Sequence, residues 1–273
     1  MKTNIVYNKN CLETMAGFGN ESIDLVVTSP PYDDLRDYNG FSFDFENIAK
    51  ELYRTIKAGG VVVWVVGDST HKGNKSLTSF RQCLFFKDTG FSVYDVMIYK
   101  KTGGSPPAAR RYVNAFEYMF ILSKGIPKYV NLIKDKPNKY AGTYHYGIQS
   151  RRLADGTLKL SKDNKPVNEF GIRYNIWEYA TGYNNSTTDK IAFEHPAIFP
   201  EKLAQDHIIS WSNENDIVYD PFAGSGTTIK MALLNNRRVI GSEMSPAYCE
   251  IIRQRIEPDY KLVIDNDTTN RNR

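Results

Sequence analysis

The N-terminal part of the chain alternates short apolar runs with one amphipathic stretch. The runs at 23–28 and 61–66 are rich in valine, as expected for strands that are buried on both faces of a parallel sheet. From residue 44, apolar side chains recur at the spacing of one helix face, and we expect that helix to end at Gly59-Gly60. We predict strands over residues 4–7, 23–28, 61–66, 93–99 and 116–122, with the last two at the edge of the sheet.

The same alternation returns in the C-terminal part of the chain. We predict helices over 197–210, 227–234 and 246–256, and strands over 216–219 and 238–241. Pro246 stands at the first-turn position that proline favours in helices. The tail from Pro258 is polar, and we expect it to be frayed. The two patterned parts together predict an α/β fold with a mostly parallel sheet and helices on both faces.

The middle of the chain, from about 124 to 190, has a different character. Aliphatic residues become rare, and tyrosine, asparagine, glycine and lysine dominate. Asp155-Gly156 between two short runs predicts a hairpin turn. Because Trp177 and many tyrosines imply packing, we interpret this stretch as an inserted region and not as a linker.

The distribution of charge along the chain indicates what kind of partner the protein binds. Residues 100–173 contain 15 basic and five acidic residues, a net charge of +10 within a chain of net charge +4, which leaves −6 for the rest. A basic middle on an otherwise acidic chain favours a polyanionic partner, although a solvated surface would explain the charge alone. The basic residues expected to contact that partner are Lys100, Lys101, Arg110, Arg111, Arg151 and Arg152.

The 273-residue composition excludes several classes of protein. The run 61–66 is the longest apolar one and is far too short to span a bilayer. The N-terminus lacks the apolar core of a signal peptide, so we expect a cytoplasmic protein without membrane contact. The three cysteines and four histidines form no metal-ligand spacing, and neither a disulfide framework nor a metal site is expected.

Two strand ends carry residues that a simple turn does not require. The stretch DLVVTSPPY at 24–32 ends in Ser-Pro-Pro-Tyr, where a turn would more usually recruit Gly, Asn or Asp. The stretch IVYDPFAGSGTT at 217–228 is a strand followed by a glycine-rich turn that opens a helix. Gly224 and Gly226 permit close approach of a ligand, and the helix N-terminus offers unpaired N–H groups. A ligand-free tight turn explains this second motif equally well.

The next strand ends in an acid, Glu243, which adds to the second motif. An acid at this place can accept hydrogen bonds from ribose hydroxyls, as in dinucleotide-binding folds. A helix-capping role is the plainer alternative. The turn lacks both the full dinucleotide spacing and the Gly-Lys-Ser/Thr of a P-loop. The features together predict a nucleoside-containing ligand whose other half need not be a pyrophosphate.

TSPPY at 28–32, DPFAGSGTT at 220–228 and HPAIFPEKL at 195–203 resemble the motifs of the DNA amino-methyltransferases. The order of the motifs is similar to that of the β group of this family, and the resemblance covers roughly 4–125 and 190–257. It implies a Rossmann-like methyltransferase fold with permuted motif order. The implied parts are a catalytic half at 1–127, an inserted target-recognition region at 128–190, a cofactor-binding half at 191–257 and a polar tail at 258–273.

The resemblance also implies S-adenosylmethionine as cofactor and double-stranded DNA as partner, and it is compatible with a cognate restriction endonuclease and a homodimer. The residues that it assigns to catalysis are Ser29, Pro30, Pro31 and Tyr32. The residues that it assigns to the cofactor are Asn10, Cys11, Thr28, His195, Pro196, Phe199, Pro200, Asp220, Phe222, Gly224, Gly226, Thr227 and Glu243.

Methylation of an exocyclic amine requires help, because the lone pair of the nitrogen is delocalised into the ring. The Ser29 side chain and the Pro30 carbonyl are suitable acceptors for the amine protons, and a strand end can hold them rigidly. Tyr32 would stack on the target base, at about 1–3 kcal/mol per base. That is comparable to the cost of flipping the base from the duplex. Asp68 should lie at the same edge of the sheet, either in the pocket or beside it.

Our choice between cytosine and adenine as the methylated base rests on one residue of the motif, Ser29, which does not decide it alone. A serine at the first motif position favours cytosine N4 in this family, whereas aspartate usually accompanies adenine N6. We therefore predict an N4-cytosine enzyme that acts on specific sites in duplex DNA. The alternatives are an N6-adenine enzyme, a DNA-binding protein without catalysis, and methylation of RNA or of a protein amide.

Overall fold

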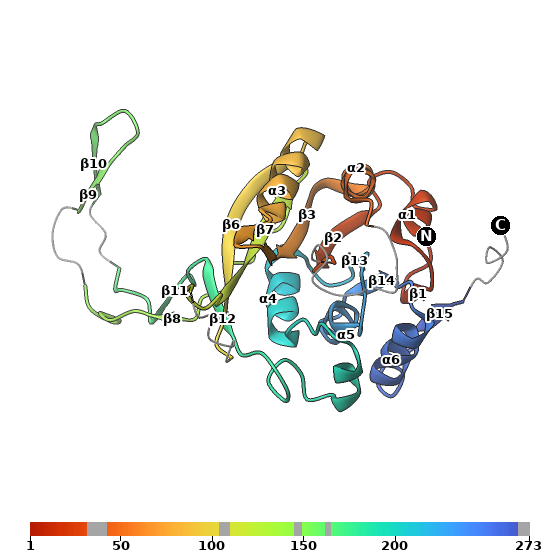
Figure 1. Ribbon diagram of the computed structural model, residues 1–273. Coiled ribbons are helices and arrows are strands. Elements are labelled where there is room, and N and C mark those ends of the chain that lie inside the picture. Colours follow the sequence, from red (N-terminus) through yellow and green to blue (C-terminus); the bar gives the residue numbers. More distant parts are fainter. Residues whose placement is uncertain (32–42, 104–109, 145–148, 162–164, 267–273) are drawn as a thin grey trace. The chain divides into compact units, whose positions relative to one another are not determined.

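The computed structural model describes residues 1–31, 43–103, 110–144, 149–161 and 165–266 (Figure 1). The contacts between residues divide the chain into two compact units. The larger unit comprises Met1–Asn131 and Asn175–Arg273, and the smaller one comprises Leu132–Tyr174.

A nine-stranded sheet forms the centre of the larger unit within the described residues. Its strands, in spatial order, are β12 (Ile176–Tyr179), β6 (Ser92–Lys101), β7 (Phe116–Ser123), β3 (Ile56–Val66), β2 (Ile23–Thr28), β13 (Ile217–Asp220), β14 (Arg238–Ser242), β1 (Ile5–Tyr7) and β15 (Val263–Asp265). Neighbouring strands are parallel except β7, which is antiparallel to both β3 and β6. The predicted α/β fold with a mostly parallel sheet is confirmed.

Helices cover both faces of this sheet (Figure 1). The helices on one face are α1 (Cys11–Ala16), α2 (Phe45–Thr55) and α3 (Thr78–Thr89). Those on the other are α4 (Glu201–Trp211), α5 (Thr227–Leu234) and α6 (Pro246–Ile256), with the 3₁₀ helix Lys190–Glu194 beside α6. A pair of two-residue strands, β4 (Thr70–His71) and β5 (Asn74–Lys75), precedes α3. None of the described helices has the length and apolarity needed to cross a membrane.

The core explains why these segments fold as they do. Val61 to Val66 of β3 are almost fully buried, as continuous apolar strands at a sheet centre must be. The predicted apolar face of α2 packs on them through Ile48, Ala49 and Leu52, all buried. Asp44 caps the N-terminus of α2 through its side chain.

The glycine pair Gly59-Gly60, which was predicted to end α2, lies within strand β3. The helix ends at Thr55, and Ile56 already begins β3, so the predicted end of the helix was wrong. A Cβ on Gly60 would lie 2.8 Å from Ile56 Cγ1 and 2.9 Å from the Asp24 carbonyl oxygen. Glycine is therefore required because β2 and β3 approach closely where their register shifts between Ile23 and Leu25.

Three other expectations differ from the structure. β6 and β7 do not form the edge of the sheet, because β12, which arises from the predicted insert, pairs with β6. The helix expected from 197 begins at Glu201, after Pro200, whose extended backbone stands at the N-cap. The tail expected to be frayed contains β15, which pairs in parallel with β1. By contrast, α5 and α6 have the predicted bounds.

The smaller unit, Leu132–Tyr174, contains the predicted hairpin. β9 (Gln149–Arg152) pairs antiparallel with β10 (Leu158–Ser161), and Gly156 occupies the turn with φ +85°. Asp155 Oδ1 accepts a hydrogen bond from Thr157 N at 2.9 Å, as turn aspartates commonly do. A second pair, β8 (Lys136–Pro137) and β11 (Phe170–Gly171), joins the ends of the unit. The unit is shorter than the predicted insert 128–190, and its role in target recognition stays a prediction.

Candidate active site at the carboxyl edge of the sheet

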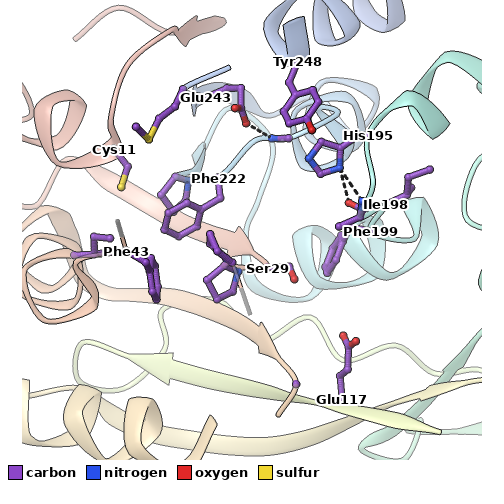
Figure 2. A pocket seen from close by; sticks show the side chains of 18 of the residues that line it. Cys11, Ser29, Phe43, Glu117, His195, Ile198, Phe199, Phe222, Glu243 and Tyr248 are labelled. Carbon is purple, nitrogen blue, oxygen red and sulfur yellow. Dashed lines mark hydrogen bonds between the residues drawn. The ribbon is translucent and has the colours of Figure 1, made fainter. Parts of the chain in front are cut away.

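A cavity of about 1020 Å³ opens where the parallel strands of the larger unit end (Figure 2). This edge is where open α/β sheets bind their ligands. The residues that directly follow β2, β3, β13 and β14 line it, namely Ser29, Pro30, Pro31, Gly67, Asp68, Pro221, Phe222 and Glu243. The two sequence motifs therefore share one cavity, although about 190 residues separate them along the chain.

A buried hydrogen bond joins the two motifs beneath the cavity. Thr28 Oγ1 donates to Asp220 Oδ1 at 2.7 Å, and Phe222 N donates to the same oxygen at 3.0 Å. Burial raises the pKa of the Asp220 carboxyl to about 6, against the opposing effect of these donors. From the first turn of helix α5, Thr228 Oγ1 donates to the Val27 carbonyl at 3.1 Å. The ends of β2 and β13 are thus held in register by side chains as well as by the sheet.

The Glu243 carboxylate is the second buried acid of the site. Its Oε2 accepts from Gly224 N and its Oε1 from Ser245 N, both at 2.8 Å. Burial raises its pKa to about 7, and the charge of nearby Asp220 adds to this shift while the backbone donors oppose it. Each carboxylate oxygen can accept further hydrogen bonds, so Glu243 can still receive hydroxyl donors from the cavity.

The glycine-rich turn lies against the ring of His195. Gly224 has φ +52°, and a Cβ on it would lie 3.0 Å from His195 Nε2. The ring is fixed from the other side, because Ala197 N donates to His195 Nδ1 at 3.1 Å. It also contacts the ring of Tyr248, with centroids 4.4 Å apart (Figure 2). His195 thus lines one side of the cavity, and its ring can lie there because residue 224 has no side chain.

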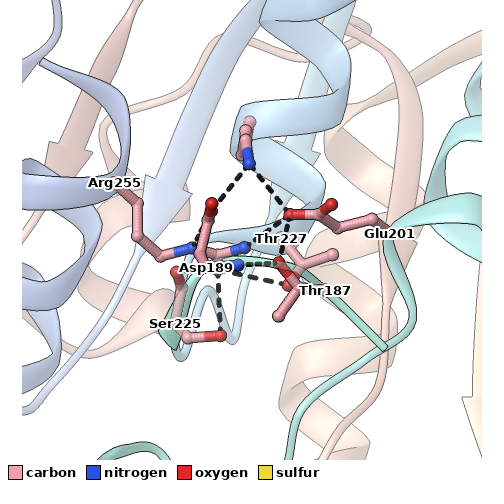
Figure 3. A network of polar contacts seen from close by, with 7 residues as sticks. Thr187, Asp189, Glu201, Ser225, Thr227 and Arg255 are labelled. Atoms are coloured by element: carbon pink, nitrogen blue, oxygen red, sulfur yellow. Dashed lines mark hydrogen bonds and ion pairs between the residues drawn. The ribbon is translucent and has the colours of Figure 1, made fainter. Parts of the chain in front are cut away.

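A partly buried ionic network supports this turn from behind (Figure 3). Asp189 Oδ2 contacts Lys230 Nζ at 2.6 Å and Arg255 Nε at 3.0 Å. Glu201 Oε1 contacts the same two cations, Lys230 Nζ at 3.1 Å and Arg255 Nη2 at 2.8 Å. The Arg255 side chain is fully buried, so the network has its cationic centre in the protein interior.

The Arg255 guanidinium also holds the glycine-rich turn directly. Its Nη1 donates to the Ser225 carbonyl and lies 3.2 Å from Ser225 Oγ and 3.4 Å from Thr227 Oγ1. The network therefore connects α4, α5, α6 and the 3₁₀ helix to the loop that borders the cavity.

Most of the residues predicted to form the site line this cavity. Those that do are Asn10, Cys11, Ser29, Pro30, Pro31, His195, Phe199, Pro200, Phe222, Gly224 and Glu243. Thr28, Asp220 and Thr227 lie buried behind it, and Gly226, at φ +83°, is the N-cap residue of α5. Pro196 precedes the Ala197 contact of His195 without lining the cavity. Tyr32 lies outside the described residues.

The predicted DNA-contacting residues are dispersed. Lys100 pairs with Glu178 at 2.8 Å, and Lys101 pairs with Glu117 and lines the cavity. Arg110 and Arg111 are exposed in the larger unit, and Arg151 and Arg152 are exposed on β9 of the smaller one. A DNA-contacting role for them stays a prediction.

Some cavity residues were not predicted from the sequence. They are chiefly aromatic or come from the antiparallel part of the sheet, namely Phe43, Tyr99, Asn114, Glu117, Thr181 and Tyr248. Asp68, which the sequence placed at this edge, does line the cavity. Its carboxylate accepts from Ser79 N at 2.9 Å and Ser79 Oγ at 2.8 Å, so it also holds the first turn of α3. The described residues contain no cluster of side chains able to hold a metal ion.

Three comparisons with known proteins agree with this geometry. The sequence model of the DNA methylase family matches residues 23–254. The orphan methyltransferase M.BamHII of Bacillus amyloliquefaciens is 58% identical over 240 residues, which cover 88% of this chain and 90% of that protein. Among solved structures, the cytosine-N4-specific PvuII DNA methyltransferase matches with TM-score 0.67 at 22% identity, over 95% of this chain and 91% of that one.

A DNA modification methylase of Thermus thermophilus, complexed with S-adenosyl-L-methionine, matches with TM-score 0.62 at 22% identity. The match covers 95% of this chain and 98% of the other. At this identity the two structures show the fold, and they confirm the predicted Rossmann-like methyltransferase architecture.

Proposed function

Because the chain belongs to the DNA methylase family of N6/N4 methyltransferases, we propose that it transfers a methyl group from S-adenosylmethionine to cytosine N4 in specific sites of duplex DNA. Its assignment to the DNA amino-methyltransferases, first made from the motifs, is confirmed by the family match. The observation that carries the proposed methyl transfer is the shared cavity, which brings Ser29 of the first motif to the same space as Glu243. The choice of cytosine rests on the serine at the first motif position.

The residues of the cavity fit the proposed cofactor. Glu243 offers carboxylate oxygens to ribose hydroxyls, and Gly224 leaves a cradle beside His195 that a Cβ would fill. We assign the adenine side to Asn10 and Cys11, which open α1 at the same cavity. When bound, S-adenosylmethionine supplies a methyl group on a sulfonium, which is an excellent leaving group.

The chain's own contribution is to hold the amine of an extruded cytosine. In the proposal Ser29 Oγ and the Pro30 carbonyl accept hydrogen bonds from the two amine protons, so that the nitrogen lone pair becomes available for the methyl group. Proline fixes its φ and offers no competing N–H, which keeps the acceptor in place. The strand end that carries both residues is rigid, because β2 is buried throughout. Alignment of this kind can provide a large part of the rate.

Cofactor binding is predicted to tighten as the pH rises from 6 to 8. The pKa of Glu243 is raised to about 7, so roughly one tenth of the carboxyl is ionised at pH 6 and most of it at pH 8. Ribose hydroxyls donate preferentially to the ionised form, and the Kd for S-adenosylmethionine should therefore fall about tenfold over this range. Titration calorimetry across this pH range measures the effect.

The matched variant Glu243→Gln should bind weakly and without this pH dependence. The apo protein should show the opposite trend in stability, because a folded-state pKa above the ordinary 4.5 costs stability as the pH rises towards 7. A pH dependence that persists unchanged in Glu243→Gln would contradict the assignment of Glu243 to the ribose.

We assign target recognition to the smaller unit. Exchanging residues 132–174 for the corresponding stretch of a relative with another site should change the methylated sequence but leave cofactor affinity within about twofold, because the cavity lies in the larger unit. Sequencing of the modified DNA reads the outcome. Methylation of the original site by the exchanged protein would refute the assignment. A cognate endonuclease, a homodimer and a cytoplasmic location remain predictions.

The experiment that tests the proposed function is methyl transfer from labelled S-adenosylmethionine to duplex DNA. Label should enter DNA and not RNA or protein offered under the same conditions. A protein that binds the cofactor but labels none of these would support the reading of a DNA-binding protein without catalysis and would overturn the proposal.

A further inference from the structure

One residue that lines the cavity carries a buried polar atom that the described protein does not satisfy. Tyr99 lines the cavity and is only 3% exposed. Its hydroxyl Oη has no hydrogen-bond partner within the described part of the chain. An unsatisfied buried hydroxyl costs free energy, and each such group in a native structure requires an explanation, such as an ordered water, an ion or a catalytic role.

The surroundings of Tyr99 are polar and come from two strands of opposite direction. Tyr99 lies near the carboxyl end of β6, directly opposite Glu117 near the amino end of the antiparallel strand β7. Lys101 pairs with Glu117, and its Nζ lies 5.9 Å from the centroid of the Tyr99 ring. Figure 2 shows the Glu117 carboxylate pointing into the cavity. Because β7 runs antiparallel, it brings its first residues to the edge where the parallel strands end.

The hydroxyl of Tyr99 keeps its proton under all ordinary conditions. Burial raises the pKa of the phenol far above its ordinary value of 10, and the negative charge of Glu117 raises it further. Tyr99 can therefore act as a neutral donor. A neutral donor in a dry site matches a neutral acceptor, whereas a charged one would demand more compensation.

The order of the strands places Tyr99 and Glu117 on a different side of the cavity from Glu243, the residue proposed to bind the ribose of the cofactor. Glu243 follows β14, which is five positions from β6 in the sheet, roughly 24 Å at the usual spacing of parallel strands. β2, which carries Ser29, lies between them, three positions from β6 and two from β14. Tyr99 therefore faces the part of the cavity that lies beyond Ser29 as seen from the ribose site.

We propose that Tyr99 is a further substrate-binding residue, which donates a hydrogen bond to the unprotonated ring nitrogen next to the reacting amine of the extruded base. In cytosine this acceptor is N3, and in adenine it would be N1. The inference rests on the proposed function. The amine would then be held by Ser29 and the ring by Tyr99, with the Lys101–Glu117 pair bordering the same wall.

The test compares Tyr99→Phe with the wild-type protein on two duplexes. Both carry the site mapped by sequencing of DNA that the wild type has methylated, and one has 3-deazacytosine, which has C–H in place of N3, at the target position. If the wild-type product is N6-methyladenine, the second duplex carries 1-deazaadenine at the target position in place of 3-deazacytosine. On the natural base Tyr99→Phe should lower the single-turnover rate roughly 5- to 150-fold. On the deaza base the two proteins should agree within about twofold, because the acceptor is missing from the substrate.

Two further measurements separate binding of the base from a structural role. The melting temperature of Tyr99→Phe should equal or exceed that of the wild type, because the lost hydroxyl has no partner in the described protein. The Kd for S-adenosylmethionine should stay within about twofold. Tyr94→Phe, an exposed tyrosine on the same strand, is the matched control and should match the wild type on both duplexes.

The outcomes are distinguishable. An equal loss of rate on both duplexes, or no loss on the natural base, overturns the inference and leaves the proposed function intact. A lowered melting temperature with an equal loss on both duplexes assigns Tyr99 to the fold instead. If the wild type labels no DNA at all, the proposed function fails and the inference fails with it.

Discussion

Replacement of Ser29 by alanine is expected to lower kcat by about 10²- to 10³-fold, the loss observed when one preorganised hydrogen-bonding group is removed from a reacting centre. The Pro30 carbonyl remains as a single acceptor, so some transfer should persist. The Kd for S-adenosylmethionine should change less than about twofold, because Gly224 and Glu243 follow other strands, β13 and β14. Single-turnover rates and calorimetry separate the two effects.

Ser22→Ala is the matched control for this prediction. Ser22 precedes the other end of β2, where its Oγ donates to the Gly19 carbonyl at 2.8 Å, away from the cavity lining. Its replacement should leave kcat unchanged. If Ser29→Ala retained full kcat, or lost cofactor affinity and rate together, the assigned role of Ser29 would be wrong.

Replacement of Arg255 by methionine should destabilise the protein by about 3–5 kcal/mol, because it removes a fully buried cation from two partly buried acids. Burial alone would raise the pKa of Asp189, but hydrogen bonds from Lys230 and Arg255 outweigh it and lower the pKa below its ordinary value. Without Arg255, both Asp189 and Glu201 depend on Lys230 (Figure 3). The melting temperature should fall by roughly 10 °C for a chain of this size.

The same helix supplies the control. Arg253 pairs with Glu250 and with Glu257 at 2.7 Å, but its side chain is 43% exposed. Surface pairs of this kind contribute about 0–1 kcal/mol, so Arg253→Met should leave the melting temperature almost unchanged. Equal losses from the two variants would show that the buried network has no special importance. Since Arg255 also holds the Ser225 carbonyl, its variant should in addition weaken cofactor binding.

Local signals in the sequence were enough to predict the elements that depend on neighbouring residues. α5 and α6 follow from a glycine-rich turn and from a proline at the first turn, and both have the predicted bounds. The glycine pair after α2 misled the prediction, because the same residue type that ends helices also permits two strands to approach closely. Only the pairing of β2 with β3 distinguishes the two roles of Gly60.

The residues of the candidate site could be predicted where they directly follow a buried apolar strand. Ser29 and Glu243 each follow a buried apolar strand, and parallel strands bring such ends to one edge. Tyr99 and Glu117 could not be found in this way, since their strands were placed at the edge without a direction. Their position depends on β7 being antiparallel and on β12 covering β6, which is a property of the whole sheet.

The identity of the methylated nucleoside tests the central claim most directly. Duplex DNA is incubated with the protein and S-adenosylmethionine, digested to nucleosides and analysed by mass spectrometry, with Ser29→Ala as the matched control. We predict N4-methylcytosine in the wild-type sample and a strongly reduced amount with the variant. N6-methyladenine as the product would contradict the assignment of cytosine, and the absence of any methylated nucleoside would contradict the proposed function itself.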